Sequence, residues 1–244
     1  MIRSRFSPYR VLPALVLAAI ALHAWAAPPA PAPATSAAAP AAIAHPQVEF
    51  TTSQGDFVIE LFPDKAPKTV ANFLRYVEEG FYDGTVFHRV IPGFLIQGGL
   101  YTRELRPKRT LPPIPDEADN GLSNLRGTVA AARGPDPDSA TSQFFINVVD
   151  NPRLDYVGNQ NGMTWGYAVF GKVVKGMAVI DKIDHLPTFP QGPFIGDVPR
   201  PLVVIDSAKL IGNAAQPTAE PVSPVTGQAP ASAPAASAKP AAKH

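Results

Sequence analysis

Proline crowds both ends of this 244-residue chain, and its placement limits how much of the chain can fold. Many of the 29 prolines fall in two Ala/Pro-rich tracts, over 27–46 and 213–244. These tracts lack hydrophobic periodicity, so they bury too little apolar surface to offset the entropy lost on ordering. We expect a linker over 27–46, one folded domain over 47–212 and a disordered tail over 213–244.

The first 26 residues have the pattern of a secretory signal peptide. Three arginines in the first ten residues precede a mostly apolar run over 11–26. Ala24 and Ala26 then occupy the minus-three and minus-one positions of a cleavage site. Because a membrane span needs about 18 apolar residues, this run predicts cleavage near Ala26 and no stable span afterwards. An uncleaved anchor is the alternative.

Charge and cysteine content exclude several classes of function. The formal net charge is only +1, and the densest basic cluster, over 103–109, lies in a loop bounded by prolines. Nucleic-acid recognition usually needs a sustained basic face, so we expect no nucleic-acid partner. The chain has no cysteine, and its five histidines show no paired ligand spacing. We therefore expect no disulfide, no thiol nucleophile, no metal site and no cofactor.

Period-two patterns predict most of the domain as β-strands. Residues 47–52 and 57–61 alternate around a Gly-Asp turn, which is typical of a hairpin. From Pro67 the period changes to 3.6, which predicts a helix that ends at Gly80. Further strands are expected over 127–132, 142–148, 167–174 and 202–210, and a second helix over 175–184. This pattern favours a closed or sandwiched all-β fold with helical caps.

The loop over 100–125 contains the acidic residues Asp116, Glu117 and Asp119. This trio lacks the alternating ligands and central glycine of a calcium loop, so a solvated loop is favoured.

A second motif, Gly166-x4-Gly171-Lys172, has P-loop spacing. Its interior is a hydrophobic strand and no Ser or Thr follows the lysine, so the P-loop is rejected.

The stretch over 87–99 holds two apolar runs that a Pro-Gly turn separates. Arginine is rarely buried without a partner, so Arg89 in this stretch needs an explanation. Either Arg89 points into water, or it forms a polar corner with Gln97 in an apolar groove. The neighbouring His88 is interpreted as a packed structural residue.

Three ordered blocks of this sequence resemble the cyclophilin family of peptidyl-prolyl cis–trans isomerases, most closely its bacterial exported members. They cover 87–99 (FHRVIPGFLIQGG), 142–146 (SQFFI) and 169–173 (VFGKV). The resemblance implies a mainly-β fold, a closed eight-stranded antiparallel barrel capped by two α-helices. It also implies isomerisation of X–Pro bonds without a cofactor.

The resemblance also suggests individual site residues. Arg89 corresponds to the family's catalytic arginine, and Gln97 to the glutamine that holds it. The positions that resemble the walls of the proline pocket are Phe94, Leu95, Phe145 and Leu154. Gln143 and Ala132 resemble contacts to the substrate backbone, and Tyr167 stands in the pocket where many members carry His.

Two departures from the family pattern concern substrate and inhibitor contacts. Arg133 stands where many members have an Asn that bonds the substrate backbone. Arg153 replaces a Trp that is associated with binding of the cyclic peptide cyclosporin, so weak cyclosporin inhibition is expected.

The function implied is isomerisation of proline-containing segments of unfolded or folding exported proteins, by a periplasmic monomer that stabilises the transition state through Arg89. A non-catalytic proline-peptide-binding module or holdase chaperone is the alternative; it would keep the pocket but not need Arg89. A third hypothesis is that the barrel carries small apolar ligands; this hypothesis predicts a deep cavity inside the barrel.

Overall fold

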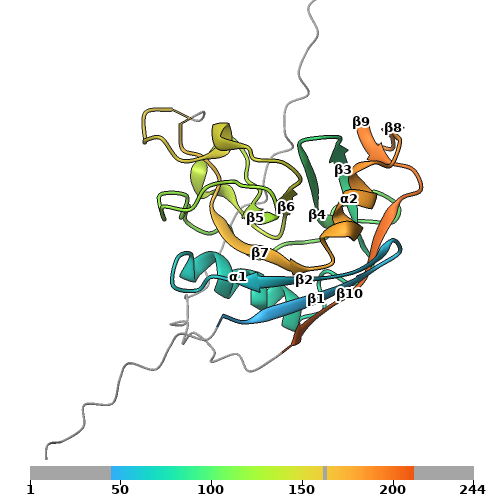
Figure 1. Ribbon diagram of the computed structural model, residues 1–244, viewed down its shortest axis with the longest axis horizontal. Coiled ribbons are helices and arrows are strands. Elements are labelled where there is room, and N and C mark those ends of the chain that lie inside the picture. The colour runs from blue at the N-terminus through green and yellow to red at the C-terminus, as the bar shows by residue number, and fades with distance from the viewer. Residues whose placement is uncertain (1–44, 162–163, 212–244) are drawn as a thin grey trace, which may run out of the picture. The chain divides into compact units, whose positions relative to one another are not determined.

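The computed structural model describes residues 45–161 and 164–211 (Figure 1). The strands are β1 (Gln47–Thr52), β2 (Gly55–Leu61), β3 (Thr85–Ile91), β4 (Leu95–Thr102), β5 (Thr128–Ala131), β6 (Phe144–Asn147), β7 (Val169–Lys175), β8 (Thr188–Gln191), β9 (Phe194–Pro199) and β10 (Val203–Ile211). The α-helices are α1 (Pro67–Glu78) and α2 (Met177–Asp184), and short 3-10 turns cover Pro137–Ser139 and Pro152–Leu154. The signal peptide expected over 1–26, nearly all of the linker and the tail over 213–244 lie outside the described residues.

Eight of these strands form a closed barrel. Their order around the barrel is β1-β10-β3-β4-β6-β5-β7-β2, and every neighbouring pair is antiparallel. Closure pairs every strand on both sides and leaves no free sheet edge, which removes the usual template for aggregation. The mainly-β prediction of an eight-stranded antiparallel barrel with two helical caps is confirmed.

Aromatic side chains fill the barrel. Phe50 and Phe57 are fully buried and stack with ring centroids 5.0 Å apart, and Phe144 packs 5.6 Å from Phe50. A cavity beside Phe73 and Phe144 measures about 10 Å³, enough for no more than one water molecule. In the described residues, this aromatic packing favours a barrel filled by side chains over one that carries apolar ligands in a deep interior cavity.

Helix α1 is held at both ends by features that its sequence encodes. Pro67 occupies the first turn, and Gly80 ends the segment with a left-handed φ of +62°. The apolar stripe buried against the barrel comprises Val70, Phe73, Leu74 and Val77. The period-3.6 prediction is confirmed.

Glu117 caps α1 from a distant loop. Its carboxylate accepts hydrogen bonds from the backbone N–H groups of Lys68 (3.0 Å) and Thr69 (2.8 Å) and from the Thr69 hydroxyl (2.8 Å). A carboxylate at a helix N-terminus satisfies free N–H groups and matches the helix dipole. The expectation of a merely solvated acidic loop is therefore wrong for Glu117.

A two-stranded hairpin, β8–β9, was not predicted from the sequence. Its segment, TFPQGPFIGDVP over 188–199, is broken by proline and glycine and lacks clean alternation. Strand β9 packs beside β3, the strand that carries Arg89 (Figure 1). In the described part of the chain, neither helix is long or apolar enough to span a bilayer.

Candidate active site

Arg89 begins a chain of polar side chains that runs from β3 across β4 to Gln143, the residue before β6. In the register of β3 and β4, Arg89 lies opposite Gln97. The Arg89 guanidinium donates from Nη1 to Gln97 Oε1 (3.4 Å), and Gln97 Nε2 donates to Gln143 Oε1 (3.0 Å). The sequence prediction that Gln97 holds Arg89 agrees with this geometry, and Gln143 extends the chain.

Asp197, which no sequence argument identified, contacts the other edge of the guanidinium. Its Oδ2 lies 3.5 Å from Arg89 Nε, and both side chains are nearly half exposed. Asp197 adopts a left-handed φ of +64°, a conformation that Asp and Asn tolerate better than most residues. Among residues 45–161 and 164–211, no protein group accepts a hydrogen bond from Arg89 Nη2. The arginine is thus held at Nε and Nη1, and Nη2 is left for a ligand.

His88 anchors the hairpin that carries Asp197. Its ring is 3 % exposed and packs against Tyr101 (4.6 Å) and against Phe194 of β9 (5.2 Å between centroids). Burial, helped by the charge of Arg89, lowers the pKa of His88 from 6.5 to about 4. The imidazole is therefore neutral at neutral pH, and the prediction of a packed structural histidine is confirmed.

A cluster of apolar side chains, interpreted from the sequence as the walls of a proline pocket, adjoins this polar chain. Leu95, Ala132 and Phe145 are buried in one cluster. The partly buried side chains that pack against this cluster are Phe94, Leu122, Leu154 and Tyr167. Phe145 lies opposite Gln97 in the register of β4 and β6, so the pocket wall and the polar chain share one face of the sheet.

All of the site residues predicted from the sequence are therefore close together, in either the polar chain or the apolar cluster. Their roles in catalysis and binding stay predictions. Ala130, Val169 and Leu122 also line the cluster and were missed. Ala130 and Val169 lie in strands that the pattern predicted, whereas Leu122 belongs to a long loop whose path has no periodic signal.

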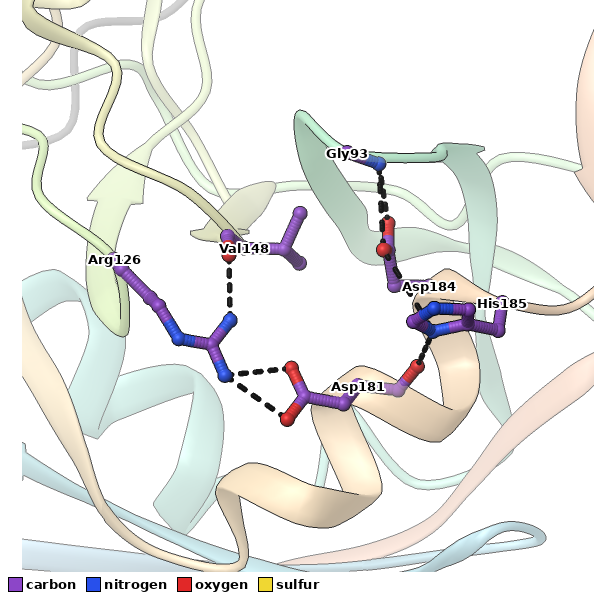
Figure 2. A network of polar contacts seen from close by, with 6 residues as sticks. All are labelled: Gly93, Arg126, Val148, Asp181, Asp184 and His185. Atoms are coloured by element: carbon purple, nitrogen blue, oxygen red, sulfur yellow. Dashed lines mark hydrogen bonds and ion pairs between the residues drawn. The ribbon is translucent and has the colours of Figure 1, made fainter.

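The backbone of Phe94 is fixed by a network that reaches α2 (Figure 2). Gly93 follows Pro92 in the β3–β4 turn with a φ of +68°, and its N–H donates to both carboxylate oxygens of Asp184 (3.0 and 3.3 Å). The Phe94 carbonyl accepts from Asn151 Nδ2 (2.9 Å) and from the N–H of Val148 (3.2 Å). The pocket wall is therefore held on both sides of Phe94.

Arg126 ties the same region to α2. Its Nη1 donates to the Val148 carbonyl (2.5 Å), and its Nη2 donates to both oxygens of Asp181 (2.8 and 2.9 Å), as Figure 2 shows. Asp181 and Asp184 both lie on α2. Helix α2 thus contacts the turn before Phe94 through Asp184. Through Asp181 and Arg126 it is also connected to Val148, the residue after β6.

Two further arginines stack on the aromatic walls of the pocket. The guanidinium carbon of Arg153 lies 4.5 Å from the centre of the Phe94 ring. That of Arg133 lies 4.7 Å from the Tyr167 ring, and its Nε and Nη2 donate to the Gly166 carbonyl (2.9 and 2.6 Å).

The Asp116 carboxyl lies close enough to Arg133 for the two side chains to interact electrostatically. Burial raises the pKa of Asp116 from 3.8 to about 6, and the charge of Arg133 limits that rise. No group of three or more His, Asp or Glu side chains in the described residues has a metal-binding arrangement.

The structure thus combines a closed eight-stranded antiparallel barrel, two α-helices and an apolar surface cluster beside Arg89. Residues 47–210 match the family described as cyclophilin type peptidyl-prolyl cis-trans isomerase/CLD. The chain belongs to this family, and it is a peptidyl-prolyl cis–trans isomerase.

Curated relatives and solved structures agree with this assignment. The chain is 54% identical to peptidyl-prolyl cis-trans isomerase A of Dickeya dadantii, over 70% of this chain and 87% of that protein. It is also 54% identical to peptidyl-prolyl cis-trans isomerase B of Escherichia coli, over 67% of this chain and 98% of the relative. A Cryptosporidium parvum cyclophilin is 26% identical with a TM-score of 0.55, over 70% of this chain and 99% of that structure.

Proposed function

We propose that Arg89 stabilises the twisted transition state of X–Pro isomerisation and that the apolar pocket beside it holds the proline ring. The observation that carries this proposal is the arrangement of the guanidinium. Gln97 and Asp197 contact Nη1 and Nε, while Nη2 has no protein acceptor among the described residues. A structure of the Cryptosporidium parvum relative was determined in the presence of the dipeptide Ala-Pro, which supports a prolyl ligand here as well.

The chemistry of the bond explains why an arginine suits this role. Rotation about an X–Pro bond must cross a barrier of about 18–20 kcal/mol, because twisting breaks the amide resonance. In the twisted state the proline nitrogen regains a localised lone pair, which can accept a hydrogen bond. A donor aimed at that nitrogen binds the transition state better than either planar ground state. Arginine stays charged at any ordinary pH, and its planar group offers several fixed donors.

The other site residues have supporting roles in this mechanism. Gln97 fixes the guanidinium, and Gln143 fixes Gln97 through their 3.0 Å hydrogen bond. Phe94, Leu95 and Phe145 enclose the pyrrolidine ring, with Leu154 and Tyr167 at the edge. Gln143 and Ala132 hold the substrate backbone. A rate gain of about a million-fold requires about 8 kcal/mol, which a preorganised cation and an anchored ring can share.

We further propose that this isomerase acts on proline-containing segments of exported proteins as they fold in the periplasm. The support is the N-terminal pattern of basic flank, apolar run and small residues that ends at Ala26. Cell fractionation with an N-terminal sequence of the mature protein tests this location. A mature chain that begins at Ala27 in the periplasmic fraction is expected, and a full-length cytoplasmic chain contradicts it.

Replacement of Arg89 by lysine in the full chain tests the mechanism. A point charge cannot reproduce the planar donors, so isomerisation of an Ala-Pro peptide should fall at least tenfold while the fold is kept. Arg103→Lys is the matched control, because Arg103 pairs with Asp206 (3.1 Å) away from the pocket. Wild-type turnover in Arg89→Lys contradicts the mechanism. The alternative, a holdase or binding module, predicts peptide binding with no catalysis even in the wild type.

A further inference from the structure

Arg153 is placed at the rim of the proline pocket by a rigid local turn. It is the middle residue of the 3-10 turn Pro152–Leu154, and the next residue, Leu154, packs into the pocket cluster. The guanidinium covers the Phe94 ring at 4.5 Å while the side chain stays exposed. A peptide whose proline contacts Phe94 and Leu154 must therefore pass close to this charge.

No carboxylate among residues 45–161 and 164–211 neutralises the charge of Arg153. Its guanidinium instead lies over the Phe94 ring. The two nearest acidic residues in the sequence are engaged elsewhere. Asp150 accepts from the N–H of Arg126 (2.8 Å), and Asp155 accepts from the N–H of Asn124 (2.6 Å). Arg153 thus presents a full positive charge to a ligand.

The remaining charges around the pocket do not cancel this one. Arg89 is balanced by Asp197 at 3.5 Å. Arg133 stacks on Tyr167 at 4.7 Å, and its charge acts on Asp116. Phe94 and Tyr167, two aromatic residues that pack against the apolar cluster, therefore each carry a guanidinium.

We propose that Arg153 makes this isomerase selective for prolyl peptides that carry a carboxylate side chain next to the proline. The proposal rests on the pocket assignment made above, because it takes the proline to lie between Phe94 and Leu154. Adjacent residues of an extended peptide are about 3.3–3.6 Å apart along the chain, within reach of an arginine at the rim. Complementary charge then favours the acidic peptide and disfavours a basic one.

Tetrapeptides that differ only beside the proline test this selectivity. Glu, Gln or Lys is placed immediately before or after the proline, and kcat/KM is measured with the full chain at low and high salt. We expect the Glu peptide to exceed the Lys peptide by about fivefold or more at one of the two positions, mainly through KM. High salt should reduce this ratio, because the charges are exposed.

Two substitutions at Arg153 assign the selectivity to this side chain. Arg153→Gln should bring the Glu-to-Lys ratio close to one, and Arg153→Glu should invert it. Arg103→Gln removes the same charge near the far end of β4 from Leu95 and should leave the ratio at its wild-type value. A wild-type ratio near one at both positions, or an unchanged ratio in Arg153→Gln, overturns the proposal. A wrong role for Arg89 would give a different result from a wrong role for Arg153. It would appear as wild-type turnover of an uncharged peptide by Arg89→Lys, whatever the Glu-to-Lys ratio is.

Discussion

Oδ2 of Asp197 lies 3.5 Å from Nε of Arg89, so strand β9 holds the arginine that strand β3 carries. The contact depends on a hairpin that sits outside the barrel. Phe194 and Val198 anchor this hairpin on either side of Asp197, Phe194 against His88 and Val198 in a buried cluster with Val86. Arg89 is thus contacted by a segment about 110 residues away along the chain, as the two residue numbers show.

Asp197→Asn is expected to lower kcat by about two- to fivefold and to change KM little, because an exposed ion pair contributes about 1 kcal/mol or less. Asparagine keeps the left-handed backbone, so the change removes only the charge. The measurement is a steady-state comparison with Asp206→Asn. Asp206 pairs with Arg103 at similar exposure, and its loss should leave kcat unchanged. Equal effects of the two substitutions would refute a specific role for Asp197.

Asp184→Ala should loosen the wall of the pocket at Phe94. It leaves the N–H of Gly93 without its acceptor, at a cost of about 1–3 kcal/mol in the free energy of unfolding. KM should rise because the turn before Phe94 is less fixed. Chemical denaturation and steady-state kinetics measure the two effects. The control is Asp181→Ala on the same helix, whose half-exposed pair with Arg126 should cost less than about 1 kcal/mol.

Stability should fall in acid through His88. The pKa of His88 is lowered to about 4 in the folded chain from 6.5 when unfolded. The folded chain binds this proton less readily than the unfolded chain. The free energy of unfolding is therefore unaffected by His88 above pH 6.5 and falls as the pH drops toward 4, by about 3 kcal/mol in total. Denaturation midpoints between pH 4 and 7 for wild type and His88→Leu measure this slope. The variant should lack the His88 part of this slope, and an identical slope in wild type and variant would contradict the assignment.

Glu117→Ala should lower the free energy of unfolding by about 1–2 kcal/mol, the usual range for a lost helix cap. The carboxylate satisfies two backbone N–H groups and one hydroxyl at the start of α1. Asp119→Ala, an exposed change two residues along the same loop, is the matched control and should be neutral. Urea denaturation distinguishes the two variants. A loss shared equally by both would mean that the loop, not the cap, is responsible.

Local patterns predicted the barrel strands and both helices because apolar residues repeat with a period of two in a strand and 3.6 in a helix. The β1–β2 hairpin and the stripe of α1 depend on neighbours a few residues apart, which a sequence displays directly. The family blocks predicted the polar chain and the pocket walls. In particular, Arg89 and Gln97 sit opposite each other in one hairpin, so their contact follows from strand register.

Contacts made by irregular segments could not be predicted in this way. Glu117 reaches α1 from a loop without periodicity, and Asp197 reaches Arg89 from a Gly/Pro-rich hairpin. The sequence Gly196-Asp197, two residues before Pro199, is typical of a turn, and nothing in it specifies a partner on β3. Long-range side-chain contacts of this kind depend on the completed barrel.

The central claim is that Arg89 acts on the transition state and not on the bound peptide. Exchange NMR of an Ala-Pro peptide with the full chain measures both the dissociation constant and the interconversion rate on the enzyme. For Arg89→Lys we predict that the rate on the enzyme falls at least tenfold while the dissociation constant changes less than about threefold. A rate equal to that of the wild type, or a loss that lies entirely in binding, would contradict the account.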